Sequence, residues 1–112
     1  MTAAAVAQPF ARPTRQHPRV VAPFIVELRT GAGAVLARAF DLSLDGLGLA
    51  DPARALRQGA ETRVAIRIPG EAREVVAPAR VTRRTGDRVG LTFLGLQWDD
   101  LFALARYLSP RL

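Results

Sequence analysis

The chain has 112 residues, of which 16 are basic and 10 acidic, so its formal net charge is +6 at neutral pH. Every basic residue is arginine, cysteine is absent, and His17 is the one histidine, which excludes disulfide scaffolds, thiolate metal sites, cysteine nucleophiles and imidazole-based metal sites. No apolar run approaches the roughly 18 residues of a membrane helix, and the first ten residues lack the basic start of a secretory signal. We therefore expect a one-domain cytoplasmic protein without membrane insertion, cofactor or metal.

The first 19 residues predict an extended basic arm. Three prolines alternate with three arginines between positions 9 and 19. Because proline lacks an amide proton and fixes φ, this stretch favours neither a helix nor a paired strand. We expect residues 1–14 to form a flexible N-terminal extension and residues 15–112 to form the folded domain, with Arg15 and Arg19 on its leading arm.

The middle of the chain alternates apolar and polar residues with a period of two, which is typical of strands. A glycine-containing turn separates the first two runs, and Thr85-Gly86-Asp87 separates the last two, so each pair predicts a β-hairpin. The six predicted strands lie within residues 24–29, 34–42, 47–49, 63–68, 75–81 and 89–93.

Two segments predict helices. Asp51, Pro52 and Gly59 are the cap, first-turn and terminating residues of a short connecting helix. After Gly95 the apolar residues repeat with a helical period, which predicts a C-terminal helix that ends before Pro110. The stripe expected on one face of that helix consists of Trp98, Leu101, Ala105 and Leu108.

These elements together predict an all-β fold. It is a small six-stranded antiparallel β-barrel with a short connecting helix and a C-terminal α-helix, which would plug or cover one end. Closing the sheet into a barrel would leave no exposed strand edges.

Two short motifs differ greatly in specificity. Arg15 and Arg19 form an R-x-x-x-R spacing, which is expected about twice by chance in so arginine-rich a chain. Asp41, Ser43 and Gly46 form a D-x-S-x-x-G pattern after the second strand. The chain has two serines, so the random expectation of this pattern is roughly 0.01. The second motif therefore carries the specificity.

In this order, the two motifs resemble the PilZ domain, the bacterial receptor module for cyclic di-GMP. The resemblance continues through Gly59 before a strand, residues 79–81, residues 89–93 and the closing helix, and it omits only the first dozen residues. It implies a six-stranded antiparallel barrel, in agreement with the strand pattern. The chain departs from many members at Thr14, where they have another basic residue, which bears on whether one cyclic dinucleotide or a stacked pair binds.

The resemblance implies a cyclic di-GMP site formed by Arg15, Arg19, Asp41, Ser43 and Gly46. Arginine suits this ligand because a guanidinium binds phosphate or the guanine edge through two hydrogen bonds and stacks on the base. Asp41 can accept from the guanine N–H donors or hold an arginine, and Ser43 can offer a hydroxyl to phosphate or base. Gly46 permits a close approach that a Cβ would block. Arg83 is a further candidate, on a strand where some members place a residue that stacks on guanine.

We find no catalytic arrangement in the sequence. Asp99 and Asp100 would point about 100° apart on a helix, so they cannot flank a substrate, and Ser43 lacks a plausible base. We predict a non-enzymatic receptor whose arm orders around cyclic di-GMP and alters the surface presented to a downstream protein partner. One alternative is a PilZ-like adaptor that binds no nucleotide and acts through protein contacts. A nucleic-acid-binding barrel is less favoured because the sequence has few aromatic residues for stacking.

Overall fold

The structure is a computed structural model that describes residues 18–21, 25–31, 33–51 and 56–112. The predicted strands correspond to β3 to β8 and the predicted C-terminal helix to α1, which confirms the predicted fold class. The elements are β2 (Val20–Val21), β3 (Ile25–Thr30), β4 (Gly33–Leu42), β5 (Gly46–Ala50), β6 (Glu61–Ile66), β7 (Val75–Thr85), β8 (Arg88–Phe93), α1 (Trp98–Leu108) and the 3₁₀ turn η1 (Ser109–Arg111).

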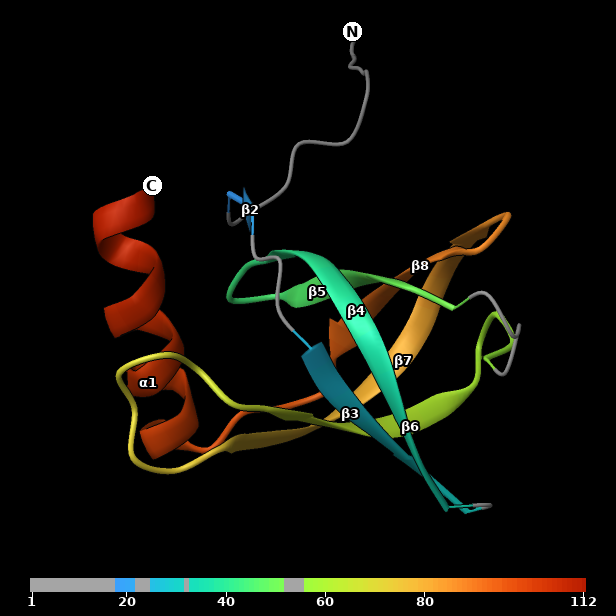
Figure 1. Cartoon of the computed structure of the whole chain (residues 1–112), viewed down its shortest axis with the longest axis horizontal. Helices are drawn as coiled ribbons and strands as arrows, with labels where there is room; N and C mark the ends of the chain where they lie inside the picture. The colour runs from blue at the N-terminus through green and yellow to red at the C-terminus, as the bar shows by residue number, and fades with distance from the viewer. Residues whose placement is uncertain (1–17, 22–24, 32, 52–55) are drawn as a thin grey trace, which may run out of the picture.

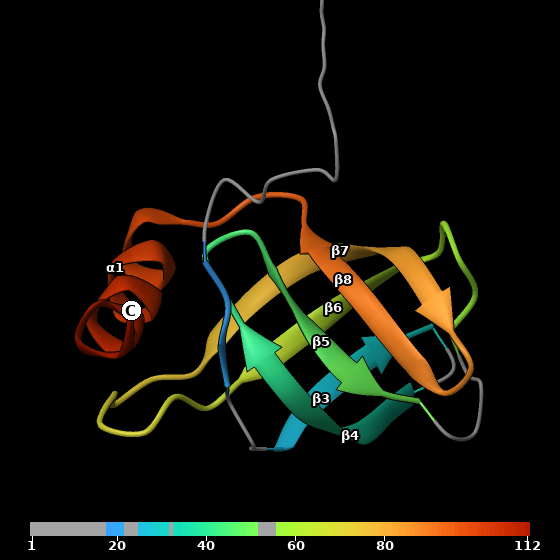
Figure 2. The same ribbon diagram turned by 90° about the horizontal axis from the view of Figure 1, so that it is seen from above.

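Six antiparallel strands close into a barrel (Figures 1 and 2). The order around it is β4-β3-β6-β7-β8-β5, and β5 pairs again with β4. The short strand β2 pairs with the end of β4, where Val20 lies opposite Leu42 and Val21 opposite Asp41. The chain just after the predicted arm is therefore held against β4.

The barrel interior is filled by the inward residues of the alternating pattern. Val64 and Ile66 of β6, with Val75, Ala77, Ala79 and Val81 of β7, are almost completely buried. Burying each larger aliphatic side chain contributes about 1.5–3 kcal/mol to folding. The period-two pattern in the sequence thus selects the residues that form the core.

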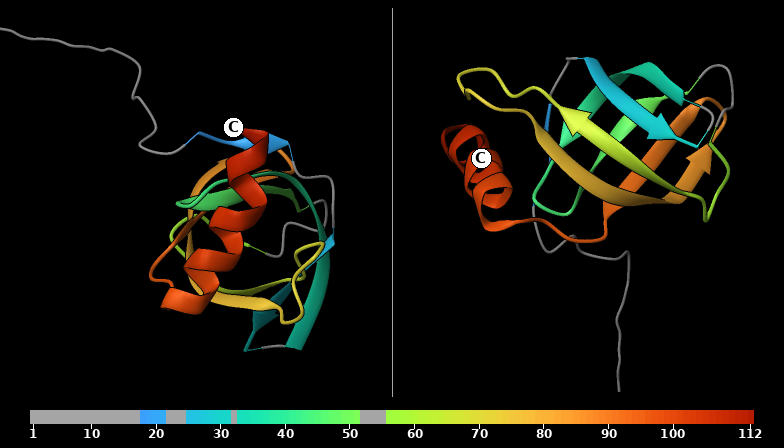
Figure 3. Two further views of the ribbon diagram at one scale, coloured as in Figure 1. Left: turned by 90° about the vertical axis from the view of Figure 1, so that its left-hand side faces the viewer. Right: turned by 90° about the horizontal axis from the view of Figure 1, so that it is seen from below.

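Helix α1 lies across one end of the barrel (Figure 3). The loop between β6 and β7 holds it through two ion-pair groups. Glu71 pairs with Arg106 at 2.7 Å, while Arg73 donates to Asp99 at 3.2 Å and to Asp100 at 3.1 Å. The eleven-residue helix is not long and apolar enough to cross a membrane, and it is the one α-helix among the described residues.

The buried face of α1 differs from the predicted stripe. Leu108 is buried as expected, but the other buried apolar residues are Ala103 and Leu104, whereas Trp98 is 72% exposed. The helix carries apolar residues on more than one side, so periodicity alone does not fix its rotation. Asp100 also lies on the buried face of the helix: its side chain is only 5% exposed and accepts from Arg73.

The predicted connecting helix falls largely on residues 52–55, which lie outside the described residues. The remaining residues of the predicted helix, Leu56 to Gln58, are not helical; the Ala60 amide closes a turn there by donating to the Arg57 carbonyl at 3.0 Å. The segment is attached to the barrel through Asp51, whose buried carboxylate accepts from Arg84 at 2.8 Å and from the Leu56 amide at 2.9 Å.

Candidate functional site

Two β-bulges change the direction of side chains on one wall of the barrel. In β4 the register shifts between Ala39 and Asp41, so Phe40 is the extra residue. Ala37 and Ala39 face the core, and strict alternation would point Asp41 inward as well. The bulge instead leaves Asp41 part-exposed and returns Leu42 to the core. A bulge places two successive residues opposite one and re-aims those that follow.

The second bulge, in β7, acts in the same way. The register with β8 shifts between Val81 and Arg83, and Thr82 is the extra residue. Val81 is buried and Arg83 exposed, while Arg84 turns toward the buried carboxylate of Asp51. The bulge therefore separates two adjacent arginines, giving Arg83 to the outer face and Arg84 to a structural ion pair.

The outer face between the bulges has a floor of two glycines. Asp41 of β4 lies opposite Gly48 of β5, Gly48 lies opposite Gly90 of β8, and Gly90 lies opposite Arg83 of β7. Four neighbouring strands span roughly 14 Å, given a spacing of about 4.8 Å. Asp41 and Arg83 thus stand at the two ends of a row whose middle carries no side chains.

Asp41 holds Arg19 at one end of this row. The Arg19 Nη1 donates to Asp41 Oδ1 at 2.7 Å, and the Gly48 amide donates to the same oxygen at 2.9 Å. A Cβ on Gly48 would lie 3.0 Å from that oxygen, so glycine makes room for the carboxylate. The Nε of Arg19 is buried and finds no hydrogen-bond partner among the described residues.

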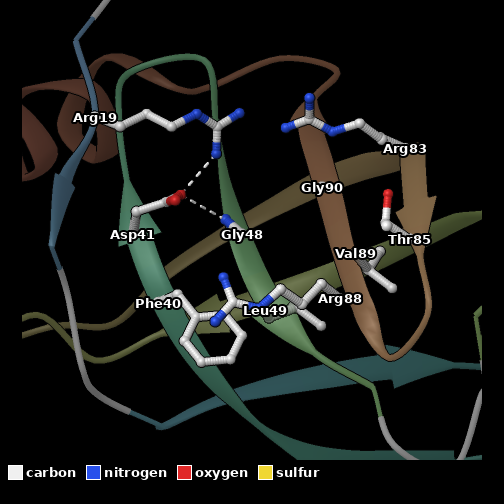
Figure 4. Close-up of a pocket in the computed structure, with 10 residues that line it drawn as sticks. All are labelled: Arg19, Phe40, Asp41, Gly48, Leu49, Arg83, Thr85, Arg88, Val89 and Gly90. Carbon is white, nitrogen blue, oxygen red and sulfur yellow. Dashed lines mark hydrogen bonds and ion pairs between the residues drawn. The ribbon is translucent and has the colours of Figure 1, made fainter.

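A cavity of about 210 Å³ lies over the glycine floor (Figure 4). Its lining residues are Arg19, Phe40, Asp41, Gly48, Leu49, Arg83, Thr85, Arg88, Val89 and Gly90. The charged members are three arginines and one carboxylate, so the lining carries a formal excess of positive charge. Such a lining favours an anionic ligand.

The D-x-S-x-x-G residues after Asp41 form a tight turn. The Ser43 amide donates to the Gly46 carbonyl at 2.9 Å, and the Ser43 hydroxyl accepts from the Asp45 amide at 3.1 Å. Ser43 is 1% exposed and lines a neighbouring cavity of about 520 Å³, which Arg19 also borders. A Cβ on Gly46 would overlap the Leu91 carbonyl oxygen, so this glycine allows β5 to approach β8.

The sequence-predicted residues fall into three groups. Arg19, Asp41 and Arg83 line one cavity, Ser43 and Gly46 build the turn beside it, and Arg15 lies outside the described residues. His17 lies outside them too. Among the described residues, no group of three acidic or histidine side chains could hold a metal ion.

Sequence reasoning missed Phe40, Gly48, Arg88 and Gly90. Gly48 and Gly90 lie inside strand patterns, where an isolated glycine indicates a close backbone approach, and this signal could have identified them. Arg88 belongs to one of the chance R-x-x-x-R spacings, so nothing in the sequence distinguishes it. Phe40 and Arg88 come together only because their strands lie in the same wall of the barrel.

A closed six-stranded barrel with an arginine-lined cavity on its outer wall defines a small β-barrel module suited to an anionic ligand. The PilZ domain family matches residues 13–109, and the chain belongs to this family. The match covers both motifs and all of the described strands and helix α1. No curated protein sequence matches the chain.

Solved structures agree with this assignment. The inhibitor of motility MotI/DgrA of Bacillus subtilis is 21% identical with a TM-score of 0.77, over 89% of this chain and 52% of that one. The PilZ domain of CeSA from a cellulose-synthesizing bacterium is 21% identical with a TM-score of 0.65, over 85% and 99%. The PilZ domain with c-di-GMP of YcgR from Escherichia coli is 16% identical with a TM-score of 0.69, over 88% and 92%.

At these identities the likeness is one of fold. The chain spans about half the length of the motility inhibitor and nearly all of the two isolated PilZ domains.

Proposed function

We propose that this chain is a non-enzymatic receptor for cyclic di-GMP in bacterial second-messenger signalling. The observation that carries the proposal is the floor of Gly48 and Gly90 between Asp41 and Arg83. Neither glycine carries a side chain, and the Arg83 side chain lies over Gly90, so a planar base can lie over Gly48 with Arg83 beside it. Family membership and the structure of the YcgR PilZ domain with c-di-GMP support the same ligand class.

The charges beside the floor support an anionic nucleotide. The Arg19 side chain is only 19% exposed and its guanidinium is held by Asp41, which fixes its direction before any ligand arrives. Its Nε is buried and has no hydrogen-bond partner among the described residues, so an acceptor on the ligand can satisfy this donor. Arg83 is exposed above Gly90, with its Nε 3.9 Å from the position of a Cβ there, so it can cover a base or bind a phosphate.

Asp41 is proposed to act in two ways. Its Oδ1 already accepts from Arg19 and from the Gly48 amide, so it positions the arginine and keeps β4 and β5 together. Its side chain is 34% exposed, which leaves the carboxylate accessible to the N–H donors of a guanine edge. Ser43 and Gly46 are proposed to shape the turn that leads from Asp41 into β5.

The proposed switch is an ordering of the arm that carries Arg15. Arg19 is held against β4 by its ion pair with Asp41, and Val20 and Val21 are held there by strand pairing. This anchored segment supports the proposal that the residues before it fold over the ligand. A ligand gains differential affinity for the ordered arm only through contacts that the arm makes, and Arg15 would supply them. A downstream protein partner would read the altered surface.

Calorimetric titration with cyclic di-GMP tests the proposal. The wild-type chain should bind, and Arg15→Ala, Arg19→Ala and Asp41→Ala should each weaken binding at least tenfold, since each removes a charge-assisted contact of about 1.5–3 kcal/mol. Arg67→Ala is the matched control, because that side chain is 73% exposed and does not line the cavity. Absence of heat with the intact chain would overturn the receptor proposal.

That negative result would favour the adaptor that binds no nucleotide. Helix α1 carries Trp98 and Phe102, whose ring centroids are 5.9 Å apart and which are 72% and 52% exposed. Exposed aromatic pairs of this kind are typical of protein contacts. The titration therefore separates the two candidate functions.

A further inference from the structure

Helix α1 carries apolar residues on two opposite sides. One side contains the buried Ala103, Leu104 and Leu108. Trp98 and Phe102 are one turn apart on the other side, where they are 72% and 52% exposed. In the left view of Figure 3 no described element lies in front of the helix. The solvent side of a surface helix is ordinarily polar, so this second apolar face indicates a docking surface.

The shape of this face is complementary to itself. Ala105 is half-buried and follows Trp98 by seven residues, which is about two turns, so it lies on the same side. We call Trp98, Phe102 and Ala105 the outer stripe. If two antiparallel copies of α1 pack about a two-fold axis at Phe102, Trp98 of each copy meets the region of Ala105 of the other. The large ring then faces a small side chain, as close packing requires.

The charges beside the outer stripe favour the same antiparallel arrangement. Asp99 and Arg106 are seven residues apart, so they flank the stripe on one side. Their side chains are 80% and 61% exposed despite their ion pairs within the chain. A two-fold axis at Phe102 brings Asp99 of one copy to within about 1.5 Å of Arg106 of the other, measured along the helix axis. Parallel helices would instead place Asp99 beside Asp99.

We propose that a second copy of this chain docks on the outer stripe, forming a symmetric dimer of antiparallel α1 helices. This inference does not depend on the receptor proposal. The exposed parts of the four rings, from Trp98 and Phe102 of both copies, amount to roughly 500–600 Å². An interface built around them lies at the small end of specific protein interfaces, below about 1,200 Å². The dimer is therefore weak, with a Kd between about 10 μM and 1 mM.

Sedimentation equilibrium of the full chain over this concentration range tests the dimer. The mass should rise from that of one chain toward that of two. Trp98 is the single tryptophan, so its emission should shift to shorter wavelength as the second copy excludes water from the ring. Phe102→Glu places two like charges at the axis and should stay monomeric. Ile25→Glu is the matched control, because Ile25 is similarly exposed, at 55%, but lies on β3.

Cysteine cross-linking tests the orientation of the two helices. The chain has no cysteine of its own, so each introduced thiol reports one position. On oxidation, a mixture of Asp99→Cys and Arg106→Cys should form a mixed disulfide faster than either variant links to itself. Two copies of position 99 would be about 9 Å apart along the axis, and two of position 106 about 12 Å, whereas a disulfide needs Cα atoms within about 7 Å. Thermal unfolding of each variant checks that the barrel is intact.

Four outcomes would overturn the proposal. The first is the mass of one chain at every concentration. The second is the same monomer co-sedimenting with phosphatidylserine vesicles, which would assign the outer stripe to a membrane surface. The third is an equal loss of the dimer in Ile25→Glu and Phe102→Glu, since net charge would then be the cause. The fourth is faster self-linking of Asp99→Cys, which would indicate parallel helices. A wild-type chain that dimerises without binding cyclic di-GMP would overturn the receptor proposal alone.

Discussion

Gly46 offers the sharpest test of how the D-x-S-x-x-G motif shapes the barrel. Gly46 begins β5 opposite Thr92 of β8, and its carbonyl accepts from the Ser43 amide. In Gly46→Ala the new Cβ would overlap the Leu91 carbonyl oxygen and lie 2.9 Å from the Leu91 carbonyl carbon and 3.0 Å from the Thr92 Cα. These are backbone atoms, so no side-chain rotation relieves the overlap.

The start of β5 must therefore move away from β8. Overpacking of this kind costs about 1–3 kcal/mol, and each lost hydrogen bond adds about 1 kcal/mol. We expect Gly46→Ala to lower the free energy of unfolding by about 3 kcal/mol. For a domain of this size, 1 kcal/mol corresponds to about 4 °C, so Tm should fall by about 12 °C.

Thermal unfolding followed by circular dichroism measures this difference. Gly95→Ala is the matched control, because a Cβ at Gly95 meets no atom within 4 Å and the residue has no left-handed φ. Its stability should remain within about 0.5 kcal/mol of the wild type. A Gly46→Ala protein as stable as Gly95→Ala would refute the close approach of β5 to β8 as the reason for glycine in the motif.

Two further predictions concern ion pairs. Arg84→Ala leaves the buried carboxylate of Asp51 without its 2.8 Å partner and should destabilise the protein by about 3–5 kcal/mol in urea unfolding; a loss below 1 kcal/mol would contradict a structural role for the pair. The hydrogen bond from Arg106 holds the pKa of Glu71 below its ordinary value, so the pair contributes stability above the unfolded-state pKa and loses it as pH falls through the folded-state pKa. The stability advantage of wild type over Glu71→Gln should therefore disappear in acid at low ionic strength, and an advantage unchanged at pH 3 would refute the linkage.

The barrel itself could be predicted from local pattern. A period of two over short runs, with turn residues between them, marks strands whose inward residues must be buried together. Val64 and Ile66, for example, are inward in the pattern and fully buried in the structure. The position of helix α1 in the chain was also predictable, because its period and its acidic first turn are local signals.

The rotation of α1 was not predictable in the same way. Trp98 belongs to the apolar stripe in the sequence but lies 72% exposed, while Leu104 is buried. The choice depends on Arg73 and Glu71, which belong to a distant loop and bind the helix through its charged residues. Periodicity describes one helix, whereas docking depends on both partners.

The sequence by itself determined the fold class, through its strand pattern, and the family resemblance, through the rare spacing of Asp41, Ser43 and Gly46. Only the tertiary structure decided which residues share a cavity. A bulge depends on the pairing of two strands, so the outward turn of Asp41 and Arg83 is invisible in either strand alone. The row from Asp41 to Arg83 crosses β4, β5, β8 and β7. Closing the barrel pairs β5 with β8, and this pairing brings together residues that are far apart in the sequence.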